Sequence, residues 1–353
     1  MPSELPIQIL AGPDALAELR DGGLDRERVR AFVGASGGPK WLVLHGLDRV
    51  LFPWLVAERN APLHAIGSSI GSWRAACLTT DDPAAAIARM GEAYIQQRYE
   101  GRPAPSVVSA EGVRILTAAL GERGHLGIGE HPRVRLHVVT ARFRHLGAME
   151  GRAQTLGLGV AALLNAVDRR ALGGALQRVV FDAGGDPGPF SPFGALPTRH
   201  VALTDENALP ALHASAAIPA VMSGVVDPPG APRGTYRDGG VADYHFGPEI
   251  DVDEGLTLYP HFYAHMVPGW FDKALPWRRT RGLRRVVLIA PSDAHVASLP
   301  GGRIPDRKDF ERMGDSERID AWHRAVALGE HMGEAFMELL ESGRLGDVAK
   351  PLE

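Results

Sequence analysis

The chain has 353 residues, 45% of them hydrophobic, which is enough to bury a large core in one or two domains. Its formal net charge of −4 gives no electrostatic case for binding nucleic acid, and its single cysteine, Cys77, excludes an intramolecular disulfide. The first residues lack the basic start and apolar run of a signal peptide, and no stretch approaches the roughly 20 apolar residues of a membrane-spanning helix. We therefore expect a soluble, cytoplasmic protein without a nucleic-acid partner.

Segments typical of strands alternate with segments typical of helices along the chain. Strands are predicted at residues 30–34, 64–67, 133–140, 178–181, 200–203 and 285–290. Helices are predicted at residues 13–20, 41–59, 70–78, from 82 onward, and at 316–345, with Pro53 kinking or ending the second of them. The alternation favours a mostly parallel sheet with helices on both faces. We expect a single domain over residues 1–353, with a core at about 30–295 and a C-terminal helical extension at about 305–353.

A glycine–x–serine–x–glycine sequence places Ser69 between Gly67 and Gly71. This spacing is typical of a nucleophile elbow, a sharp turn from a strand into a helix that lifts the serine hydroxyl toward a substrate. The small neighbours permit the strained turn and allow strand and helix to pack closely. Free N–H groups at the start of the helix favour the negative charge that develops during acyl transfer.

A glycine-rich loop at residues 34–41 (GASGGPKW) joins the first of these strands to the first long helix. It departs from a Walker phosphate loop, because a proline precedes its lysine and a tryptophan follows it, and it lacks the glycines of a dinucleotide fingerprint. Two interpretations stay open. The N–H groups of Gly37 and Gly38, with that of Ile70 after the serine, suit an oxyanion hole. Alternatively, the loop is a plain turn between strand and helix.

Two further motifs lie downstream. A small-residue segment at residues 214–219 (ASAAIP) is typical of a helix start, and Asp238 is followed by Gly239 and Gly240 after a strand-like stretch. An Asp-Gly-Gly sequence on its own is most often a turn, because aspartate bonds its own backbone and glycine takes positive φ. The Asp-Gly-Gly sequence therefore indicates a catalytic residue only in combination with the other motifs.

Taken together and in this order, the motifs resemble those of the patatin-like phospholipase family. That family's pattern is a glycine-rich oxyanion loop, a G-x-S-x-G elbow, an alanine- and serine-rich block that ends in proline, and Asp-Gly-Gly or Asp-Gly-Ala. All four occur here over roughly residues 30–245. The resemblance implies a three-layer α/β/α fold with a mostly parallel central sheet, to which this chain adds N- and C-terminal helices.

The glycine loop departs from the family's usual Asp-Gly-Gly-Gly-x-Arg-Gly. The acidic residue is absent, and Ser36 replaces a glycine, Lys40 the arginine and Trp41 the last glycine. Lysine keeps the positive charge of arginine but loses its two-pronged hydrogen bonding. These departures concern the substrate and the efficiency of the oxyanion hole rather than the fold.

The resemblance implies a catalytic dyad of Ser69 and Asp238, with no cofactor. Ser69 attacks an ester carbonyl, Asp238 accepts its proton directly, and water later releases the acid from the acyl-enzyme. The implied oxyanion hole consists of the N–H groups of Gly37, Gly38 and Ile70. An ordinary aspartate, with a pKa of about 3.9, is a feeble base. Partial burial away from cations raises that pKa, and the arginine before Asp238 points the other way in an extended segment.

Histidines downstream of Ser69 offer the alternative of a histidine-containing triad in the chain order of α/β-hydrolases. None has a recognisable setting: they are His245, His261, His265, His295 and His323. His261 and His265 are four residues apart and would share one face of a helix, as zinc ligands do. The segment lacks the glutamate of a zinc hydrolase, so we expect no metal.

The segment at residues 267–281 combines aromatic residues with arginines. This composition suits the headgroup layer of a membrane, although the aromatic side chains can equally pack inside the domain. We expect a serine hydrolase that cleaves the ester bonds of acyl lipids, with peripheral membrane contact as a further expectation. The alternatives are an esterase for small soluble esters, a non-catalytic relative that binds a lipid or a partner, and a nucleotide-binding protein that uses the glycine loop.

Overall fold

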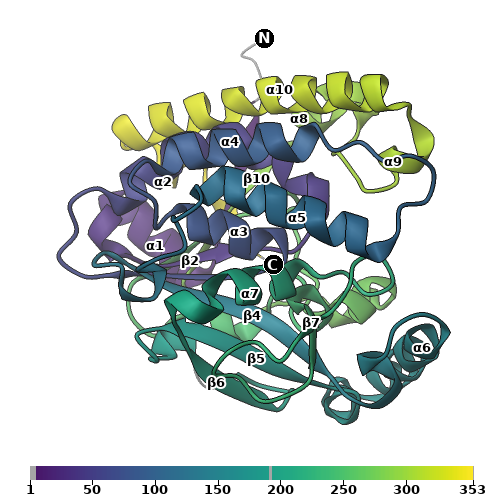
Figure 1. The fold of residues 1–353 in the computed structure, drawn as a ribbon. Helices are drawn as coiled ribbons and strands as arrows, with labels where there is room; N and C mark the ends of the chain where they lie inside the picture. Colours follow the sequence, from purple (N-terminus) through teal and green to yellow (C-terminus); the bar gives the residue numbers. More distant parts are fainter. Residues whose placement is uncertain (1–4, 191–192, 353) are drawn as a thin grey trace.

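The computed structural model describes residues 5–190 and 193–352 (Figure 1). Within them, 11 strands form one sheet in the order β11-β1-β10-β9-β2-β3-β4-β5-β6, with β8 beside β4 and β7 beside β8. Neighbours run parallel from β10 through β9, β2 and β3 to β4, whereas β10 with β1 and β4 with β5 are antiparallel. The strands are β1 (Ile7–Ala11), β2 (Val29–Gly34), β3 (Leu63–Ser68), β4 (Val134–Phe143), β5 (Leu176–Ala183), β6 (Thr198–Leu203), β7 (Val225–Val226), β8 (Thr235–Asp238), β9 (Leu256–Pro260), β10 (Val286–Pro291) and β11 (Lys350–Pro351).

Helices cover both faces of the sheet, which confirms the predicted three-layer α/β/α fold. Helices α2, α3, α4, α5 and α10 gather over one face (Figure 1). Helix α6 and short 3-10 turns pack over the end of β4 on the other face. The α-helices are α1 (Pro13–Gly22), α2 (His45–Val56), α3 (Ile70–Cys77), α4 (Pro83–Ile95), α5 (Pro105–Leu120), α6 (Arg152–Val167), α7 (Asp205–Ala216), α8 (Asp293–Ser298), α9 (Asp309–Arg312), α10 (Asp315–Glu341) and α11 (Leu345–Val348).

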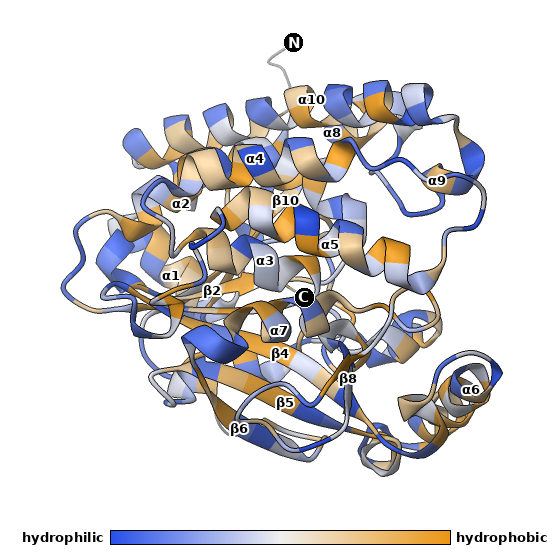
Figure 2. Ribbon diagram, in the orientation of Figure 1, coloured by the Kyte–Doolittle hydropathy of each residue, from blue (hydrophilic) through white to orange (hydrophobic). Residues whose placement is uncertain are grey.

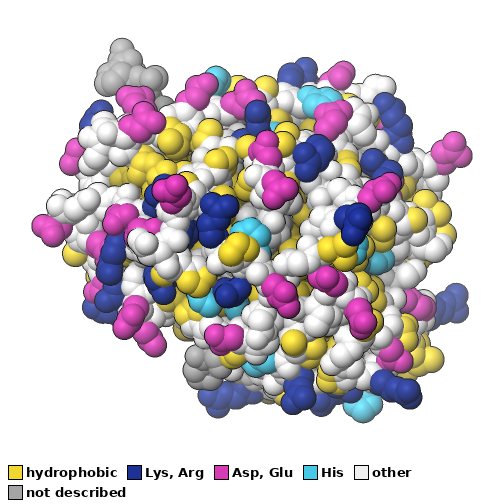
Figure 3. Space-filling model, turned by 60° about the vertical axis from the view of Figure 1, so that its left-hand side comes forward, with side chains coloured by type: hydrophobic (Ala, Val, Ile, Leu, Met, Phe, Trp, Pro, Cys, Tyr) yellow, Lys and Arg dark blue, Asp and Glu magenta, His cyan; other side chains and the backbone are white. Residues whose placement is uncertain are grey.

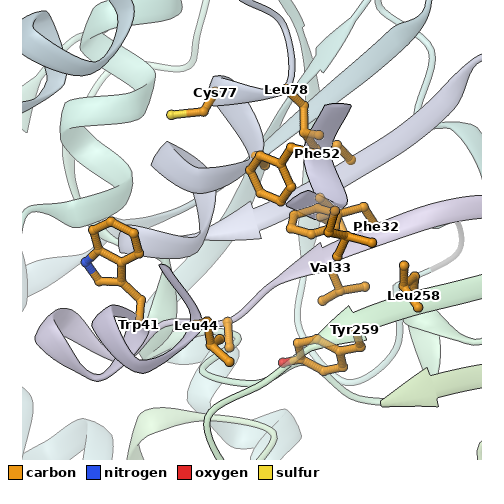
Figure 4. Close-up of a cluster of buried hydrophobic side chains, with 14 of the residues drawn as sticks. Phe32, Val33, Trp41, Leu44, Phe52, Cys77, Leu78, Leu258 and Tyr259 are labelled. Atoms are coloured by element: carbon orange, nitrogen blue, oxygen red, sulfur yellow. The ribbon is translucent and has the colours of Figure 1, made fainter. Parts of the chain in front are cut away.

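The central core holds the glycine loop and the elbow in place (Figure 4). The ring of Phe32 on β2 meets that of Phe52 on α2 edge to face, with ring centroids 5.2 Å apart. Trp41 of the 3-10 helix η2 (Gly38–Leu44), Cys77 at the end of α3 and Tyr259 on β9 are fully buried in the same core. Because β2, η2 and α3 share this core, the segments on either side of the two glycine-containing motifs are fixed relative to each other.

The predicted strands are all present, with bounds that differ from the prediction by no more than three residues. The segment at residues 30–34 was predicted as a buried strand and the segment at 133–140 from its alternation, and the structure places both in the sheet as β2 and β4. The short, fully buried β9 and the sheet-edge strands β1 and β11 were not predicted. The terminal segments therefore contribute strands to the sheet as well as helices.

Several helical predictions need correction. Residues 41–59 do not form one helix, because the chain first makes the tighter η2 and begins α2 only at His45. Pro53 lies inside the last turn of α2, which ends at Val56. The predicted C-terminal helix ends at Glu341, and the short α11 follows Gly343, whose φ of 68° is in the left-handed region. The segment at 214–219 is the end of α7 rather than a helix start, and α5 and α6 were not predicted.

Charged side chains of both signs are interspersed over the face drawn in Figure 3. Apolar residues are concentrated in the strands and on the inner sides of most helices (Figure 2). Helix α6 also carries apolar residues, although it projects from the rest of the molecule. Among the helices of the described residues, none has the length and apolar character needed to cross a membrane.

Candidate active site

Ser69 occupies a strained turn between β3 and α3. Its φ of 55° and ψ of −133° lie outside the conformations that a serine ordinarily adopts. The turn depends on its glycines: a Cβ on Gly67 would come within 2.5 Å of the Gly71 backbone, and a Cβ on Gly71 would lie 2.0 Å from the Gly34 carbonyl oxygen. The close approach of strand, helix and loop that the sequence predicted is therefore present, and only glycine permits it.

The carboxylate of Asp238, which belongs to the last of the four motifs in the sequence, contacts the hydroxyl of Ser69. The Ser69 Oγ donates a hydrogen bond of 2.9 Å to Asp238 Oδ2. The other carboxylate oxygen, Oδ1, accepts the Gly240 N–H at 2.7 Å, so the Asp-Gly-Gly turn orients the carboxylate. Arg237 points away, as expected from strand alternation, and donates to the Glu150 carboxylate at 2.8 Å.

Burial changes the basicity of Asp238. Only 8% of the residue is exposed, and the resulting loss of hydration raises its pKa to about 6. The hydrogen bonds from Gly240 and Ser69 oppose that rise but are weaker. Among the described residues, no cation forms an ion pair with this carboxylate. Asp238 is therefore a better base near neutral pH than an ordinary aspartate.

Ser215 anchors the elbow, a role that the sequence analysis did not assign. Its Oγ accepts the Ser69 N–H at 3.0 Å and donates to the Val139 carbonyl at 2.6 Å. The last turn of α7 is thereby tied to both β3 and β4. The alanine- and serine-rich block was the available signal, because a small polar residue among alanines at a buried helix end needs internal partners.

The glycine loop borders the same space as the dyad. Gly37 and Gly38 line the cavity above Ser69, and Gly38 has a φ of 55°, which favours glycine. Gly38 is the first residue of η2 and Ile70 the first of α3. The first N–H groups of a helix have no acceptor inside that helix. Ile70 is buried and is not among the residues that line the cavity.

The cavity has a volume of about 410 Å³. Ile218, Pro219 and Val221, from the segment after α7, form an apolar wall, and charged side chains form a polar wall. Its lining unites motifs far apart in the sequence. The full set is Ser36, Gly37, Gly38, Lys40, Ser69, Ile218, Pro219, Val221, Asp238, Gly240, Val241, Tyr244, Trp270, Lys273, Asp306, Arg307 and Lys308.

The polar wall carries cations that the sequence analysis missed apart from Lys40. The Lys40 ammonium is paired with the Asp306 carboxylate. Lys273 comes from the 3-10 helix η9 (Trp270–Ala274), and its Nζ lies 3.7 Å from the centroid of the Tyr244 ring. The surrounding protein removes part of the hydration of the Lys273 ammonium, and this desolvation is the main reason that its pKa falls to about 7. The positive charges of Lys40 and Arg307 lower the pKa further. Isolated lysines and arginines in loops carry no motif, so no local signal pointed to them.

A buried ion pair fixes the loop that follows the dyad aspartate. The Arg178 guanidinium, on β5, forms two hydrogen bonds to the fully buried Asp243 carboxylate. The Ser68 Oγ donates to the Asp243 carbonyl at 2.6 Å and is 2.9 Å from the Ser36 Oγ. This network links the elbow, the glycine loop and the Asp238 turn, and reaches the cavity lining at Ser36.

None of the histidines considered for a triad lies in the cavity, within the part of the chain that is described. His245 stacks on Tyr244 and meets His261 edge to face, and His323 Nε2 lies 2.9 Å from the Glu92 carboxylate on α4. His261 and His265 do not share one face of a helix, because no helix forms there: β9 ends at Pro260 and the residues after it form bends. In the described chain, no group of three His, Cys, Asp or Glu side chains is arranged to hold a metal ion.

Comparisons with known proteins give little beyond this geometry. No protein-family model and no curated protein matches the chain. A crystal structure of VipD from Legionella pneumophila aligns with 96% of this chain and 70% of that chain, at 12% sequence identity and a TM-score of 0.34. Function has therefore to be inferred from the geometry of the site.

Proposed function

We propose that this protein is a patatin-like serine hydrolase that cleaves carboxylic esters through Ser69 and Asp238. The observation that carries the proposal is the direct 2.9 Å hydrogen bond from the Ser69 hydroxyl to Asp238, at a strained elbow open to a cavity. A serine without function has no need of such a backbone conformation. A buried carboxylate with a raised pKa beside it supplies the base that the nucleophile requires.

In the proposed reaction, Ser69 Oγ attacks the ester carbonyl carbon while its proton passes to Asp238. The N–H groups of Gly37, Gly38 and Ile70 donate hydrogen bonds to the oxyanion that forms. The intermediate then collapses, the carbon–oxygen bond to the alcohol breaks, and the proton on Asp238 goes to the leaving alkoxide. A water molecule then gives a proton to Asp238 and attacks the acyl carbon. The bond from that carbon to Ser69 Oγ breaks, the proton on Asp238 returns to Oγ, and the acid is released.

We propose acyl lipids as the substrates. The apolar wall of the cavity suits an acyl chain, and the cavity lining also includes Trp270, which is 36% exposed. An esterase for small soluble esters uses the same dyad, and a non-catalytic lipid- or partner-binding relative keeps the same cavity. The chain-length preference and the reactivity of Ser69 separate these three candidates.

We expect the purified protein to hydrolyse p-nitrophenyl esters and to be labelled by a fluorophosphonate probe. Rates that rise from acetate to octanoate or longer esters support acyl lipids, because each added methylene contributes to binding in an apolar cavity. A maximum at the shortest esters favours the soluble esterase. Neither turnover at any chain length nor labelling would refute the hydrolase and leave the binding relative.

A contact surface for a membrane is proposed beside the cavity. Helix α6 exposes four apolar side chains at helical spacing, which form its apolar face: Leu156, Val160, Leu163 and Val167. At the end of α6, Trp277 is 74% exposed, and Arg278 donates hydrogen bonds to the backbone of the last helical turn. η9, which carries the cavity residue Trp270, contacts α6. Arg278 also pairs with the buried Asp272, whereas the following Arg279 and Arg281 are exposed. Apolar residues beside an exposed tryptophan and exposed arginines suit an anionic lipid surface.

Replacing Leu163 and Val167 together by glutamate is expected to weaken binding to phosphatidylglycerol vesicles by about tenfold or more, because both side chains lose insertion into the apolar layer. Vesicle co-sedimentation measures the effect. Leu126→Glu, which puts the same charge at another exposed leucine outside this surface, is the control and is expected to bind as the wild type does. Equal binding by the double variant and the wild type would contradict a role for α6.

A further inference from the structure

Charges around the cavity mouth are unbalanced. Lys273 and Arg307 both line the cavity, and within the described chain neither side chain forms an ion pair or a hydrogen bond with an acidic group. The two cavity carboxylates are otherwise engaged, because Asp306 holds Lys40 and Asp238 holds the Ser69 hydroxyl. Lys308, also in the lining, forms no ion pair among the described residues either, so three cations of the cavity have no acidic partner and the lining carries excess positive charge.

The architecture keeps these cations where they are. The buried Asp272, next to Lys273, accepts hydrogen bonds from Asn165 and from the Gly269 N–H, which fixes η9. The Asp309 carboxylate accepts the Asp306 N–H at 3.0 Å and the Trp322 indole N–H at 3.0 Å, which fixes the segment that carries Arg307. Rigid supports on both sides are what an electrostatic binding site requires.

The position of the cations relative to the dyad is specific. Arg307 is adjacent to the glycine loop, because a Cβ on Gly38 would lie 3.9 Å from its side chain. Lys273 lies over the ring of Tyr244, on the same cavity. The same lining also contains the apolar residues Ile218, Pro219 and Val221. A substrate with its ester carbonyl at Ser69 and its acyl part on these apolar residues leaves its remaining end for the cations.

We propose that Lys273 and Arg307 form an anion-binding subsite that receives a phosphate or carboxylate group of the substrate. The guanidinium of Arg307 offers paired N–H donors to such a group, and Lys273 adds a positive charge, because a bound anion favours the protonated form of its amine. The subsite rests on the proposed function for its relation to the ester, but not for its ability to bind an anion. The proposed subsite implies that the substrate is an ester with one negatively charged end.

The anion has two possible sources, a lipid headgroup or a small soluble ester, and matched substrates separate them. The headgroup pair is 1-octanoylglycerol 3-phosphate against 1-octanoylglycerol. The soluble pair is p-nitrophenyl hydrogen succinate against p-nitrophenyl butyrate. In wild type, kcat/KM is expected to favour the anionic member of at least one pair by about tenfold or more, and this ratio should fall at high salt.

Lys273→Met and Arg307→Gln are each expected to lower the ratio, and the double variant to abolish it. Arg307→Lys keeps the charge and should retain part of it. Arg312→Gln removes an exposed arginine on α9 outside the cavity lining and is expected to leave the ratio unchanged. A wild-type ratio near one for both pairs, or a ratio that persists in the double variant, overturns the subsite while leaving ester hydrolysis intact.

Direct binding of inorganic phosphate, measured by calorimetry, distinguishes a failure of the subsite from a failure of the proposed function. Phosphate binding that the double variant loses, in a protein that hydrolyses none of the four esters, upholds the subsite and refutes the hydrolase. The absence of both phosphate binding and hydrolysis in wild type refutes both. Folding of each variant is checked by its thermal unfolding midpoint.

Discussion

Ser69→Ala is expected to lower kcat for ester hydrolysis by at least about a thousandfold and to abolish labelling by the fluorophosphonate probe. The Ser69 hydroxyl is the proposed nucleophile, and none of the other cavity residues is placed by a strained turn against a buried base. Steady-state kinetics on a p-nitrophenyl ester measure the change. The loss should appear in kcat with little change in KM, because the cavity walls remain.

The matched control is Ser342→Ala, which removes an exposed hydroxyl at the end of α10, where it bonds only to its own helix. It should retain wild-type kinetics and labelling. Activity above one-tenth of wild type in Ser69→Ala would show that another residue attacks the ester. Labelling of that variant would show that the probe reacts elsewhere.

Asp238→Asn is expected to lower kcat/KM by roughly a hundred- to ten-thousandfold, because the amide cannot accept the serine proton. In wild type, the rate should rise with pH through an apparent pKa of about 6, since burial raises the pKa of Asp238 to that value and only the carboxylate acts as base. The variant should lack this acidic limb. Asp253→Asn, at an exposed position, is the control and should keep the wild-type profile.

The same raised pKa has a consequence for stability. The folded carboxyl titrates near 6, whereas its ordinary pKa is 3.8, so between these values the folded state holds a proton that the unfolded state has released. The contribution to stability is therefore present below about pH 4 and is lost as the pH rises through about 6, a loss on the order of 3 kcal/mol. Urea unfolding of Asp238→Asn should show a smaller decline than wild type over this range. Parallel curves for the two proteins would contradict the raised pKa.

The parts of the fold that were predicted correctly rest on local patterns. Short segments rich in apolar and β-branched residues marked β2, β4, β5 and β10, as a continuous apolar run in β10 and as alternation in β4. The glycines around Ser69 announced a strained turn, because no other residue tolerates the backbone contacts that it makes. Helices failed where propensity is weak: the glycine-containing α6 and the break before α11 depend on packing that a single segment does not reveal.

The sequence by itself determined the residues available for chemistry: a serine at an elbow, an aspartate in an Asp-Gly-Gly turn and a loop of glycines. These three motifs can be recognised in the sequence because each depends only on a few residues that are neighbours along the chain. Only the tertiary structure decided which of them meet, because Ser69 and Asp238 are 169 residues apart and come together through the pairing of β8 with β4. It also decided the anchor at Ser215 and the cations at the cavity mouth, since contacts between distant segments follow from packing, and isolated serines, lysines and arginines carry no pattern of their own.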